Sequence, residues 1–371
     1  MKLKILHAAD LHLDSAFEAL SAGKAAIRRA EQRKLLAALV ELAAAEAVDL
    51  VLLSGDLLDS NSAYYETGDA LLRCLRQLGV PVFIAPGNHD PYVTGSPWQR
   101  LHFPENVHIF TENAISSVFL PELNTRVYGA AFTDRRSGPL LRGFRAAEEP
   151  GVWKLLCLHG EVDVPNSAYN PISGDDLGVS GLDYAALGHI HQGSGLHRTG
   201  STWYAWPGCP EGRGFDECGE KNVYLVTLDE QGDCTVKPAC IATRRYEKLT
   251  VDVSDTEPLL AVNTVIPDDA VRDVYRITLT GETDTAPDLN RLYRNLSEMF
   301  FELQLRDETR PRRDLWESAG EDSLRGLFLK RLRERWEKAQ SAAEKQRIEQ
   351  AVRWGMAALN NAEEVVQHED P

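Results

Sequence analysis

Five short segments of this 371-residue chain contain residue types that bind metal ions and act on phosphate esters. Each segment follows a run of apolar, largely β-forming residues. In chain order they are Asp10-Leu11-His12, Gly55-Asp56, Gly87-Asn88-His89-Asp90, His159-Gly160 and Gly188-His189-Ile190-His191. This order of Asp, Asn and His side chains is what a centre that cleaves phosphoesters with two metal ions requires.

The chemistry of phosphate esters explains why these residue types matter. A phosphodiester repels nucleophiles, and two cations counter that repulsion and convert a shared water to hydroxide near neutral pH. A carboxylate bridges two cations well, and Asp56 is central in the set. Because side chains alternate along a strand, we expect Asp10 and His12 to face one site, and His189 and His191 likewise. Ligation by Asp, Asn and His without thiolate favours manganese, iron or zinc.

His89 has a different expected role, because it lies directly after the ligand candidate Asn88. An imidazole at this place can contact the scissile phosphate and protonate the leaving oxygen, or stabilise the developing charge. The next residue, Asp90, can orient that imidazole as a neighbouring carboxylate. We therefore predict His89 and Asp90 as the catalytic residues.

The predicted strands and helices explain how these segments meet. Strands are predicted at residues 4–9, 49–54 and 80–85, with helices at 24–47 and 65–78, which indicates a sheet covered on both faces by helices. The following part is rich in strands, predicted at 107–110, 117–120, 126–132, 153–158, 184–187, 202–206 and 223–228. Together they predict an α/β fold with two sheets packed as a sandwich. Ligands bind beyond the carboxyl ends of strands in open sheets, where all five segments lie.

The sequence predicts three parts. Residues 1–243 carry every metal-binding segment. Residues 244–310 are predicted to form a small α+β domain, with strands at 246–253, 274–279 and 301–305 and helices at 257–265 and 287–299. Residues 311–371 are predicted to form a helical C-terminal arm. Two apolar stripes at helical spacing mark this arm, Leu324, Leu327, Phe328, Leu332 and Trp336, then Ala351, Val352, Met356 and Leu359.

Composition limits the class of protein. Hydrophobic residues make up 43% and charged residues 26% of the chain, and no apolar run is long enough to span a membrane. The N-terminus lacks the apolar segment of a signal peptide, and none of the six cysteines forms a Cys-x-x-Cys pair, so we expect a cytoplasmic protein with free thiols. The net charge of −16 counts against strong unaided binding to nucleic acid. Two bound cations, or another subunit, would supply the missing positive charge.

Taken together, the five segments resemble the motifs of the calcineurin-like metallophosphoesterases, namely D-x-H, G-D-x-x-D, G-N-H-D, H and G-H-x-H. A closer resemblance is to the SbcD-like and YhaO-like bacterial DNA repair exonucleases, and it covers residues 1–243. It is carried by residues 7–15 (HAADLHLDS), 54–59 (SGDLLD), 86–90 (PGNHD) and 206–213 (WPGCPEGR). The resemblance implies a two-sheet metallophosphoesterase sandwich, a small α+β capping domain and a C-terminal helical arm.

The resemblance also implies a ligand set, a metal and partners. One metal would be held by Asp10, His12, Asp56 and His191, and the other by Asp56, Asn88, His159 and His189. His89 would be the acid or the transition-state stabiliser. The metal would be manganese, with iron or zinc as alternatives, and the substrate would be DNA. An SbcC-like coiled-coil ATPase would dock on the C-terminal helices, and a homodimer is a further expected assembly. Arg213 is a candidate contact to a substrate phosphate, with a solvated side chain as the alternative.

One position departs from many DNA double-strand-break nucleases of this group, which carry a His three residues after the bridging Asp. Here that residue is Asp59, which the YhaO-like branch and cyclic-nucleotide phosphodiesterases tolerate. As a plain structural residue, Asp59 would cap a turn. Two alternatives therefore stay open beside a DNA nuclease. One is a phosphodiesterase for a small nucleotide or another substrate, and the other is a weakly active subunit that mainly binds the ATPase.

Overall fold

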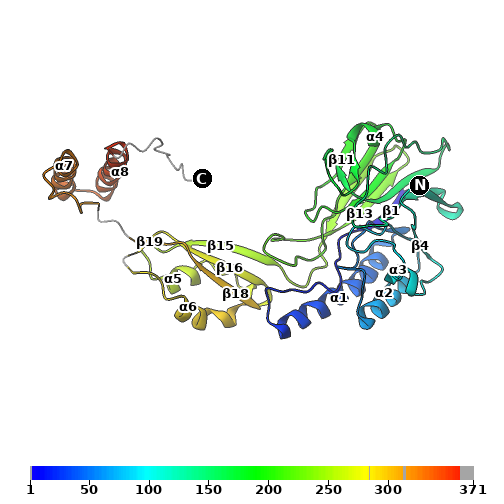
Figure 1. Cartoon of the computed structure of the whole chain (residues 1–371), viewed down its shortest axis with the longest axis horizontal. Helices are drawn as coiled ribbons and strands as arrows, with labels where there is room; N and C mark the ends of the chain where they lie inside the picture. Colours follow the sequence, from blue (N-terminus) through cyan, green and yellow to red (C-terminus); the bar gives the residue numbers. More distant parts are fainter. Residues whose placement is uncertain (1, 284, 312–314, 360–371) are drawn as a thin grey trace. The chain divides into compact units, whose positions relative to one another are not determined.

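The computed structural model describes residues 2–283, 285–311 and 315–359 (Figure 1). By its internal contacts the chain divides into two compact units. The first comprises Met1–Leu249, Pro267–Ile277 and Asn295–Gln304, and the second comprises Thr250–Ile266, Thr278–Arg294 and Leu305–Pro371. The predicted division at residues 243 and 310 stays a prediction.

The first sheet has six strands in the order β14-β13-β1-β2-β3-β4. These are β1 (Lys2–Ala8), β2 (Leu50–Leu53), β3 (Val82–Ile84), β4 (Val107–Ile109), β13 (Val223–Asp229) and β14 (Cys234–Ala239). Strands β1 to β4 are parallel, and β13 pairs antiparallel with both β1 and β14. The carboxyl ends of β1, β2 and β3 therefore lie along one edge of this sheet.

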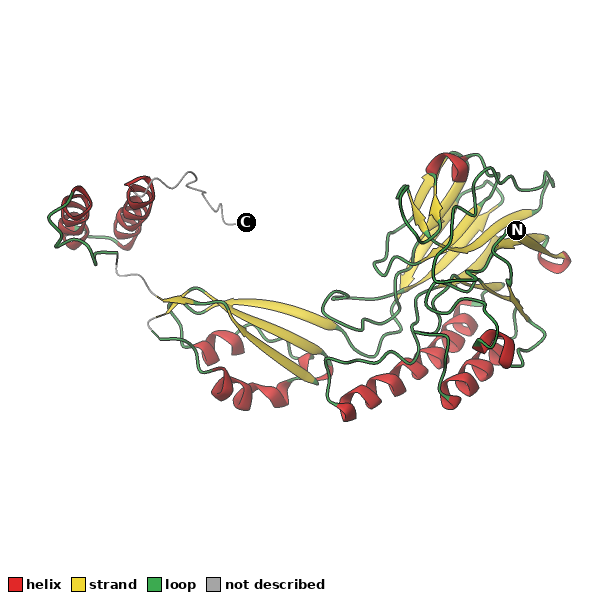
Figure 2. Ribbon diagram, in the orientation of Figure 1, coloured by secondary structure: helices red, strands yellow, loops and turns green. Residues whose placement is uncertain are grey.

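The second sheet has the order β11-β12-β10-β7-β6-β5. Its strands are β5 (Ser116–Leu120), β6 (Thr125–Gly129), β7 (Trp153–His159), β10 (Tyr184–Gly188), β11 (His197–Thr199) and β12 (Thr202–Ala205). Strands β12, β10, β7 and β6 are parallel, and the two edge strands are antiparallel. Ile5, Leu52 and Phe83 of the first sheet share a buried apolar core with Leu155 and Tyr184 of the second. The predicted α/β sandwich of two sheets is confirmed (Figure 2).

Two long helices cover the outer face of the first sheet, α1 (Ala22–Glu46) and α2 (Tyr65–Leu78). Helix α1 begins where the Ser21 side chain accepts the Lys24 N–H, and it ends at Ala47, whose backbone is left-handed. The expectation of helices on both faces of one sheet is wrong, because the second sheet covers the inner face. The outer face of that second sheet packs against loops and the short helix α4 (Gly174–Gly178).

Short elements connect the strands of the sandwich. They are α3 (Pro97–Arg100), the 3-10 helix η1 (Pro121–Leu123), and the two-residue strands β8 (Glu161–Val162) and β9 (Pro171–Ile172). None of these was predicted, because two to four residues are too few to show a periodic pattern.

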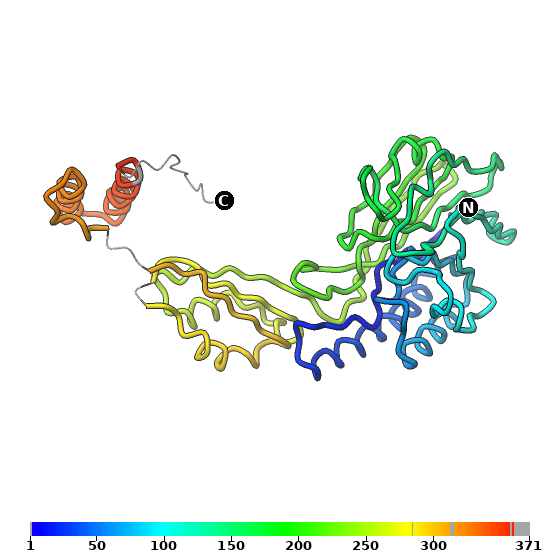
Figure 3. The backbone as a smooth tube through the Cα atoms, in the orientation of Figure 1, coloured from blue at the N-terminus to red at the C-terminus, as the bar shows by residue number. Residues whose placement is uncertain are grey.

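A third sheet contains β15 (Tyr246–Asp252), β16 (Val274–Thr280) and β18 (Glu302–Asp307), at the three places where strands are predicted. The connections contain α5 (Pro258–Asn263), η2 (Ala270–Arg272), α6 (Leu289–Leu296) and η3 (Ser297–Met299), and β17 (Glu282–Thr283) pairs with β19 (Arg310–Pro311). The tube in Figure 3 shows how these segments follow one another along the chain.

The C-terminal helices α7 (Leu324–Lys338) and α8 (Ala342–Leu359) pack against each other. Leu329 and Val352 are both 1% exposed in this hairpin. Within the predicted apolar stripe on α7, Leu324 and Leu327 are 72% and 53% exposed, whereas Leu329, which lies outside that stripe, is buried. None of the described helices is long and apolar enough to cross a membrane.

Candidate metal centre

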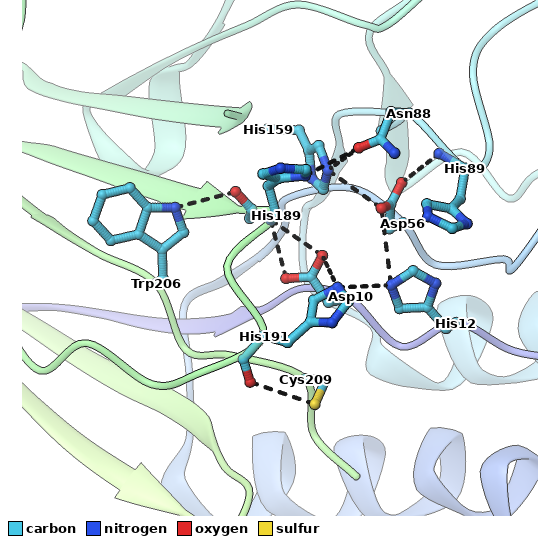
Figure 4. A network of polar contacts seen from close by, with 12 residues as sticks. Asp10, His12, Asp56, Asn88, His89, His159, His189, His191, Trp206 and Cys209 are labelled. Carbon is cyan, nitrogen blue, oxygen red and sulfur yellow. Dashed lines mark hydrogen bonds and ion pairs between the residues drawn. The ribbon is translucent and has the colours of Figure 1, made fainter. Parts of the chain in front are cut away.

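The seven predicted ligands come together at the carboxyl ends of five strands (Figure 4). Loops after β1, β2 and β3 bring one group of them from the first sheet, and β7 and the loop after β10 bring the rest from the second. Ligand atoms within 4.8 Å of one another form three groups. Two of them match the predicted ligand sets, a first set of Asp10, His12 and His191 and a second set of Asp56, His159 and His189, and the third joins His12, Asp56 and His89. Asn88 joins the second set through its carbonyl oxygen.

The ligand loops adopt an unusual backbone. Asp10, His12, Asp56 and His189 all have positive φ, at 53°, 43°, 51° and 96°. A non-glycine residue in this region costs on the order of 1–3 kcal/mol, and such residues cluster at functional sites. The expected strand alternation is therefore wrong as the reason why Asp10 and His12 share a site. Strand β1 ends at Ala8, and the left-handed backbone turns both side chains inward.

Asp56 lies between the two sets. Its Oδ1 accepts the His89 backbone N–H at 2.8 Å, and its Oδ2 lies 3.3 Å from His159 Nε2 and 3.8 Å from His12 Nε2. Among the described residues this buried Oδ2 has no hydrogen-bond partner. Burial raises the pKa of Asp56, but His159 and His12 outweigh it and lower that pKa below its usual range. A buried ionised oxygen without a hydrogen bond fits a carboxylate that bridges two cations.

The first set presents two imidazole nitrogens to each other. His12 Nε2 and His191 Nε2 are 3.2 Å apart. His12 Nδ1 lies 3.1 Å from Asp59 Oδ1, and His191 Nδ1 lies 2.7 Å from Glu217 Oε1. When both Nδ1 atoms donate to these carboxylates, both Nε2 lone pairs face the same point. A divalent cation at that point would be bound by both.

The second set has the same design. Asn88 Oδ1 lies 3.0 Å from His159 Nε2 and 3.1 Å from His189 Nδ1, so three donor atoms converge. The other nitrogen of each imidazole has an acceptor, the Ser54 carbonyl at 2.9 Å for His159 and Glu161 Oε1 at 3.1 Å for His189. The residues present therefore fit two divalent cations, with the four histidines held by a second layer of acceptors.

Burial and the charges of neighbouring groups shift the pKa values of the candidate ligands. Burial raises the pKa of Asp10 to about 6 and lowers the pKa of His12 to about 4. Burial also opposes the charged form of His159, but the charges of Asp56 and Asp10 outweigh it and raise the pKa of His159 to about 9. Divalent cations would displace the protons that Asp10 and His159 bind, because ligands must be deprotonated to bind a cation.

The structure gives His89 and Asp90 different surroundings. His89 is exposed, its ring lies 4.7 Å from the ring of His12, and its Nδ1 lies 3.3 Å from the Asp59 carbonyl. Asp90 is fully buried, and its two oxygens accept the backbone N–H groups of Gly87 and Leu58. The predicted role of Asp90 in orienting His89 is therefore wrong. Asp90 joins the loop that carries Asn88 to the loop that carries Asp56.

Arg213 was predicted to contact substrate phosphate, but its guanidinium is already engaged. It donates to both oxygens of Glu217, at 2.7 Å and 3.2 Å, and to Asp59 Oδ1 at 3.1 Å. Asp59 also contacts His12, so it supports a ligand instead of only capping a turn. His7 is buried and contacts the Tyr184 hydroxyl and the Leu187 carbonyl, so it serves as a hydrogen-bonded structural residue.

Three residues at the site were not predicted. Glu161 and Glu217 contact ligand histidines, and Trp206 Nε1 lies 3.1 Å from both the Gly160 and the Gly188 carbonyl oxygens (Figure 4). Trp206 thereby ties the chain after β7 to the end of β10. Glu161 follows His159-Gly160 directly, and this spacing was a usable signal. Glu217 has no such signal, because only the tertiary structure brings its loop to His191.

The glycine before Asn88 is required by close packing. A Cβ at residue 87 would overlap with the Asp56 carboxylate. We expect Gly87→Ala to lower phosphoester hydrolysis by at least about a hundredfold, because the bridging carboxylate must move. A chromogenic phosphodiester assay with manganese measures this. Gly138→Ala is the matched control, since a Cβ there meets nothing within 4 Å. Equal rates for both variants would contradict the assigned position of Asp56.

Comparison with known proteins also indicates phosphoester chemistry. Residues 3–193 match the calcineurin-like phosphoesterase family. The chain is 31% identical over 279 residues to the uncharacterized metallophosphoesterase YhaO of Bacillus subtilis, covering 72% of this chain and 67% of that protein. It is 27% identical to two proteins named DNA double-strand break repair protein Mre11. The Aeropyrum pernix protein aligns over 270 residues, 68% of this chain and 64% of its own length. The Saccharolobus solfataricus protein aligns over 285 residues, 68% of each chain.

The chain thus spans about two thirds of the length of these relatives. The family match covers more than half of the chain and includes all seven ligand candidates. This agrees with the two convergent sets of donor atoms around Asp56. The chain belongs to the calcineurin-like phosphoesterase family and is a metal-dependent phosphoester hydrolase.

Proposed function

We propose that this protein is a two-metal DNA phosphodiester hydrolase that acts on DNA ends in repair, with manganese as its metal. The observation that carries the proposal is the complete set of seven ligand side chains converging around Asp56. The DNA substrate is supported by the two relatives named for double-strand break repair. Mixed Asp, Asn and His ligands suit manganese, with iron and zinc as alternatives.

The cations, when bound, would neutralise phosphate charge and supply an activated water. Asp10, His12, Asp56 and His191 would hold one cation, and Asp56, Asn88, His159 and His189 the other. His89 is exposed beside this centre, so its imidazole can reach a phosphate seated there. It would donate a proton to the leaving oxygen or stabilise its negative charge. Asp59, Glu161, Glu217 and the Ser54 carbonyl keep the ligand histidines in their binding orientation.

A local basic loop supports a polyanionic substrate despite the net charge of −16. Arg135 and Arg136 are exposed, just before Ser137. The Ser137 N–H donates to the Ala168 carbonyl at 2.9 Å, and the neighbouring Tyr169 ring lies 4.8 Å from the ring of the ligand His189. The two arginines therefore lie on a loop anchored beside the metal centre, where phosphate contacts would strengthen DNA binding.

The proposed partner is an SbcC-like coiled-coil ATPase. Leu324, Leu327, Trp354 and Leu359 of the α7–α8 hairpin are exposed apolar side chains, from 40% to 72%. Such groups on a helix pair suit a helical partner. A homodimer of two copies of this chain is a further proposed assembly. A cytoplasmic location is supported by the six cysteines, all of them free thiols.

One parallel assay tests the proposed activity. Purified protein would be stripped with a chelator, reloaded with manganese, and given labelled linear duplex DNA, a DNA hairpin and a cyclic nucleotide. We expect no cleavage by the stripped protein and restored cleavage of DNA after reloading. Cleavage of the cyclic nucleotide alone would contradict the DNA proposal and favour a small-nucleotide phosphodiesterase. Asp59, in the place where many DNA nucleases carry His, is the observation that favours this second candidate. Weak cleavage of every substrate, together with firm ATPase binding, would favour the scaffold role.

Removal of the C-terminal arm separates catalysis from assembly. We expect truncation after Pro311 to leave hydrolysis of a small phosphodiester within about threefold of the full chain, because all seven ligands precede residue 192. It should remove the exposed apolar residues of α7 and α8 and so weaken ATPase binding. The measurements are a small-substrate rate and a pull-down with the ATPase. A folded truncation that has lost the small-substrate rate but still binds the ATPase would contradict this division.

A further inference from the structure

The two carboxylates that support the first pair of histidines are joined by one arginine. Asp59 Oδ1 contacts His12 Nδ1 at 3.1 Å, and Glu217 Oε1 contacts His191 Nδ1 at 2.7 Å. Arg213 Nη1 donates to the same Asp59 oxygen at 3.1 Å, and its Nη2 donates to the same Glu217 oxygen at 2.7 Å. We call Arg213, Asp59 and Glu217 the arginine clamp.

We propose that Arg213 is a positioning residue that orients both histidines of the first metal site and sets the cation affinity of that site alone. A histidine binds a cation through Nε2 only when its proton is on Nδ1 and its ring is held. Each clamp carboxylate accepts a hydrogen bond from the Nδ1–H group of one histidine. The carboxylates must themselves be held, and a guanidinium fork does so with charge-assisted hydrogen bonds of defined direction.

The contacts of Glu217 show that the clamp is a built arrangement. Its side chain is 4% exposed, and its Oε2 also accepts the Arg213 backbone N–H at 2.7 Å. Arg213 Nη2 and His191 Nδ1 are 3.1 Å apart, and both reach Glu217 Oε1 at 2.7 Å. With a hydrogen on each nitrogen, the carboxylate oxygen accepts from both. This arrangement leaves His191 Nε2 free for a cation.

The second metal site is supported separately. His159 Nδ1 contacts the Ser54 carbonyl, and His189 Nε2 contacts Glu161 Oε1. The contacts of the Arg213 side chain are to Glu217, Asp59 and His191. Loss of Arg213 should therefore act on the first site and leave the second unchanged.

The clamp also gives a physical reason for Asp59. Its Oδ1 accepts from the His12 imidazole and from the Arg213 guanidinium at once. A histidine at this position could not do so, because an imidazole offers at most one acceptor nitrogen and no negative charge. In this chain the residue three positions after Asp56 thus serves ligand positioning, and the proton-transfer role stays with His89.

Two single-site backgrounds test the proposal through metal binding. His189→Ala leaves the first site, and His191→Ala leaves the second. Calorimetric titration with manganese, checked by the electron paramagnetic resonance of free manganese, gives the affinity of the remaining site. We expect Arg213→Gln to weaken binding about 10–100-fold in the His189→Ala background. In the His191→Ala background the change should be below about threefold. Glu161→Gln is the matched control, with the opposite expected pattern.

Further variants keep the test decisive if Arg213→Gln does not fold, as judged by circular dichroism. Asp59→Asn should weaken the first site in the same direction, and Arg213→Lys should restore part of the affinity, since it keeps the charge but not the fork. Equal weakening in both backgrounds, or none in the His189→Ala background, would overturn the proposal. The inference rests on the metal centre and not on the DNA substrate, so a protein that cleaves no DNA could still show the selective loss.

Discussion

Replacing Asp56 with alanine is expected to abolish hydrolysis of every phosphodiester substrate. Its Oδ2 lies between His159 and His12, is buried, and has no hydrogen-bond partner among the described residues, so it is the group placed to bridge two cations. Without it, both sites lose a shared anionic ligand. A loss of several kcal/mol of transition-state stabilisation corresponds to a fall in kcat on the order of a thousandfold or more. The measurement is kcat with saturating manganese on a small phosphodiester and on linear duplex DNA.

The Asp56→Ala variant needs one control for correct folding and one for the loss of charge. Asp268→Ala removes an exposed aspartate elsewhere and should keep the full rate. Asp56→Asn keeps the size of the side chain and removes its charge, and we expect it to lose nearly as much activity as alanine. Metal analysis should show fewer than two cations per chain in both Asp56 variants. Turnover near that of the unmodified protein in Asp56→Ala would end the two-metal interpretation.

Replacing His89 with glutamine is expected to lower kcat roughly a hundredfold while manganese content stays near two per chain. General acid catalysis of this kind contributes about 10²–10⁴-fold. The His89 ring is exposed and lies 4.7 Å from the His12 ring, and neither of the two predicted ligand sets includes it. Glutamine keeps a hydrogen-bonding side chain but cannot deliver a proton as an imidazolium does.

The His89 variant is compared with a control substitution at another exposed histidine. His102→Gln changes an exposed histidine of the same domain and should leave kcat unchanged. His89 also lies within ligand distance of His12 and Asp56, so a role in metal binding is a real alternative. If His89→Gln lost one manganese ion per chain, His89 would be a ligand and the proposed acid would have to be another group.

The sequence by itself determined the fold class and singled out the seven candidate ligands that the fold brings together. Strands β1, β2, β3, β7 and β10 are apolar runs, and each is followed by its motif, so the edge at which the motifs meet follows from the parallel order. Helix α2 lies at Tyr65–Leu78, the range predicted from periodicity. These features are local patterns of a few residues, and local patterns can be read along a chain.

Only the tertiary structure decided how the site is supported. Asp90 follows His89 in sequence, but burial and two backbone donors turn its carboxylate to Gly87 and Leu58 instead. Arg213 and Glu217 come from a loop far along the chain, and they matter because folding brings them to His191 and Asp59. The left-handed backbone of Asp10 and His12 was hidden as well, because it accompanies hydrogen bonds from their N–H groups to the Gly55 and Asp56 carbonyls of a loop distant in sequence. Contacts between residues distant in sequence leave no periodic trace, so the support of the metal ligands became visible only in three dimensions.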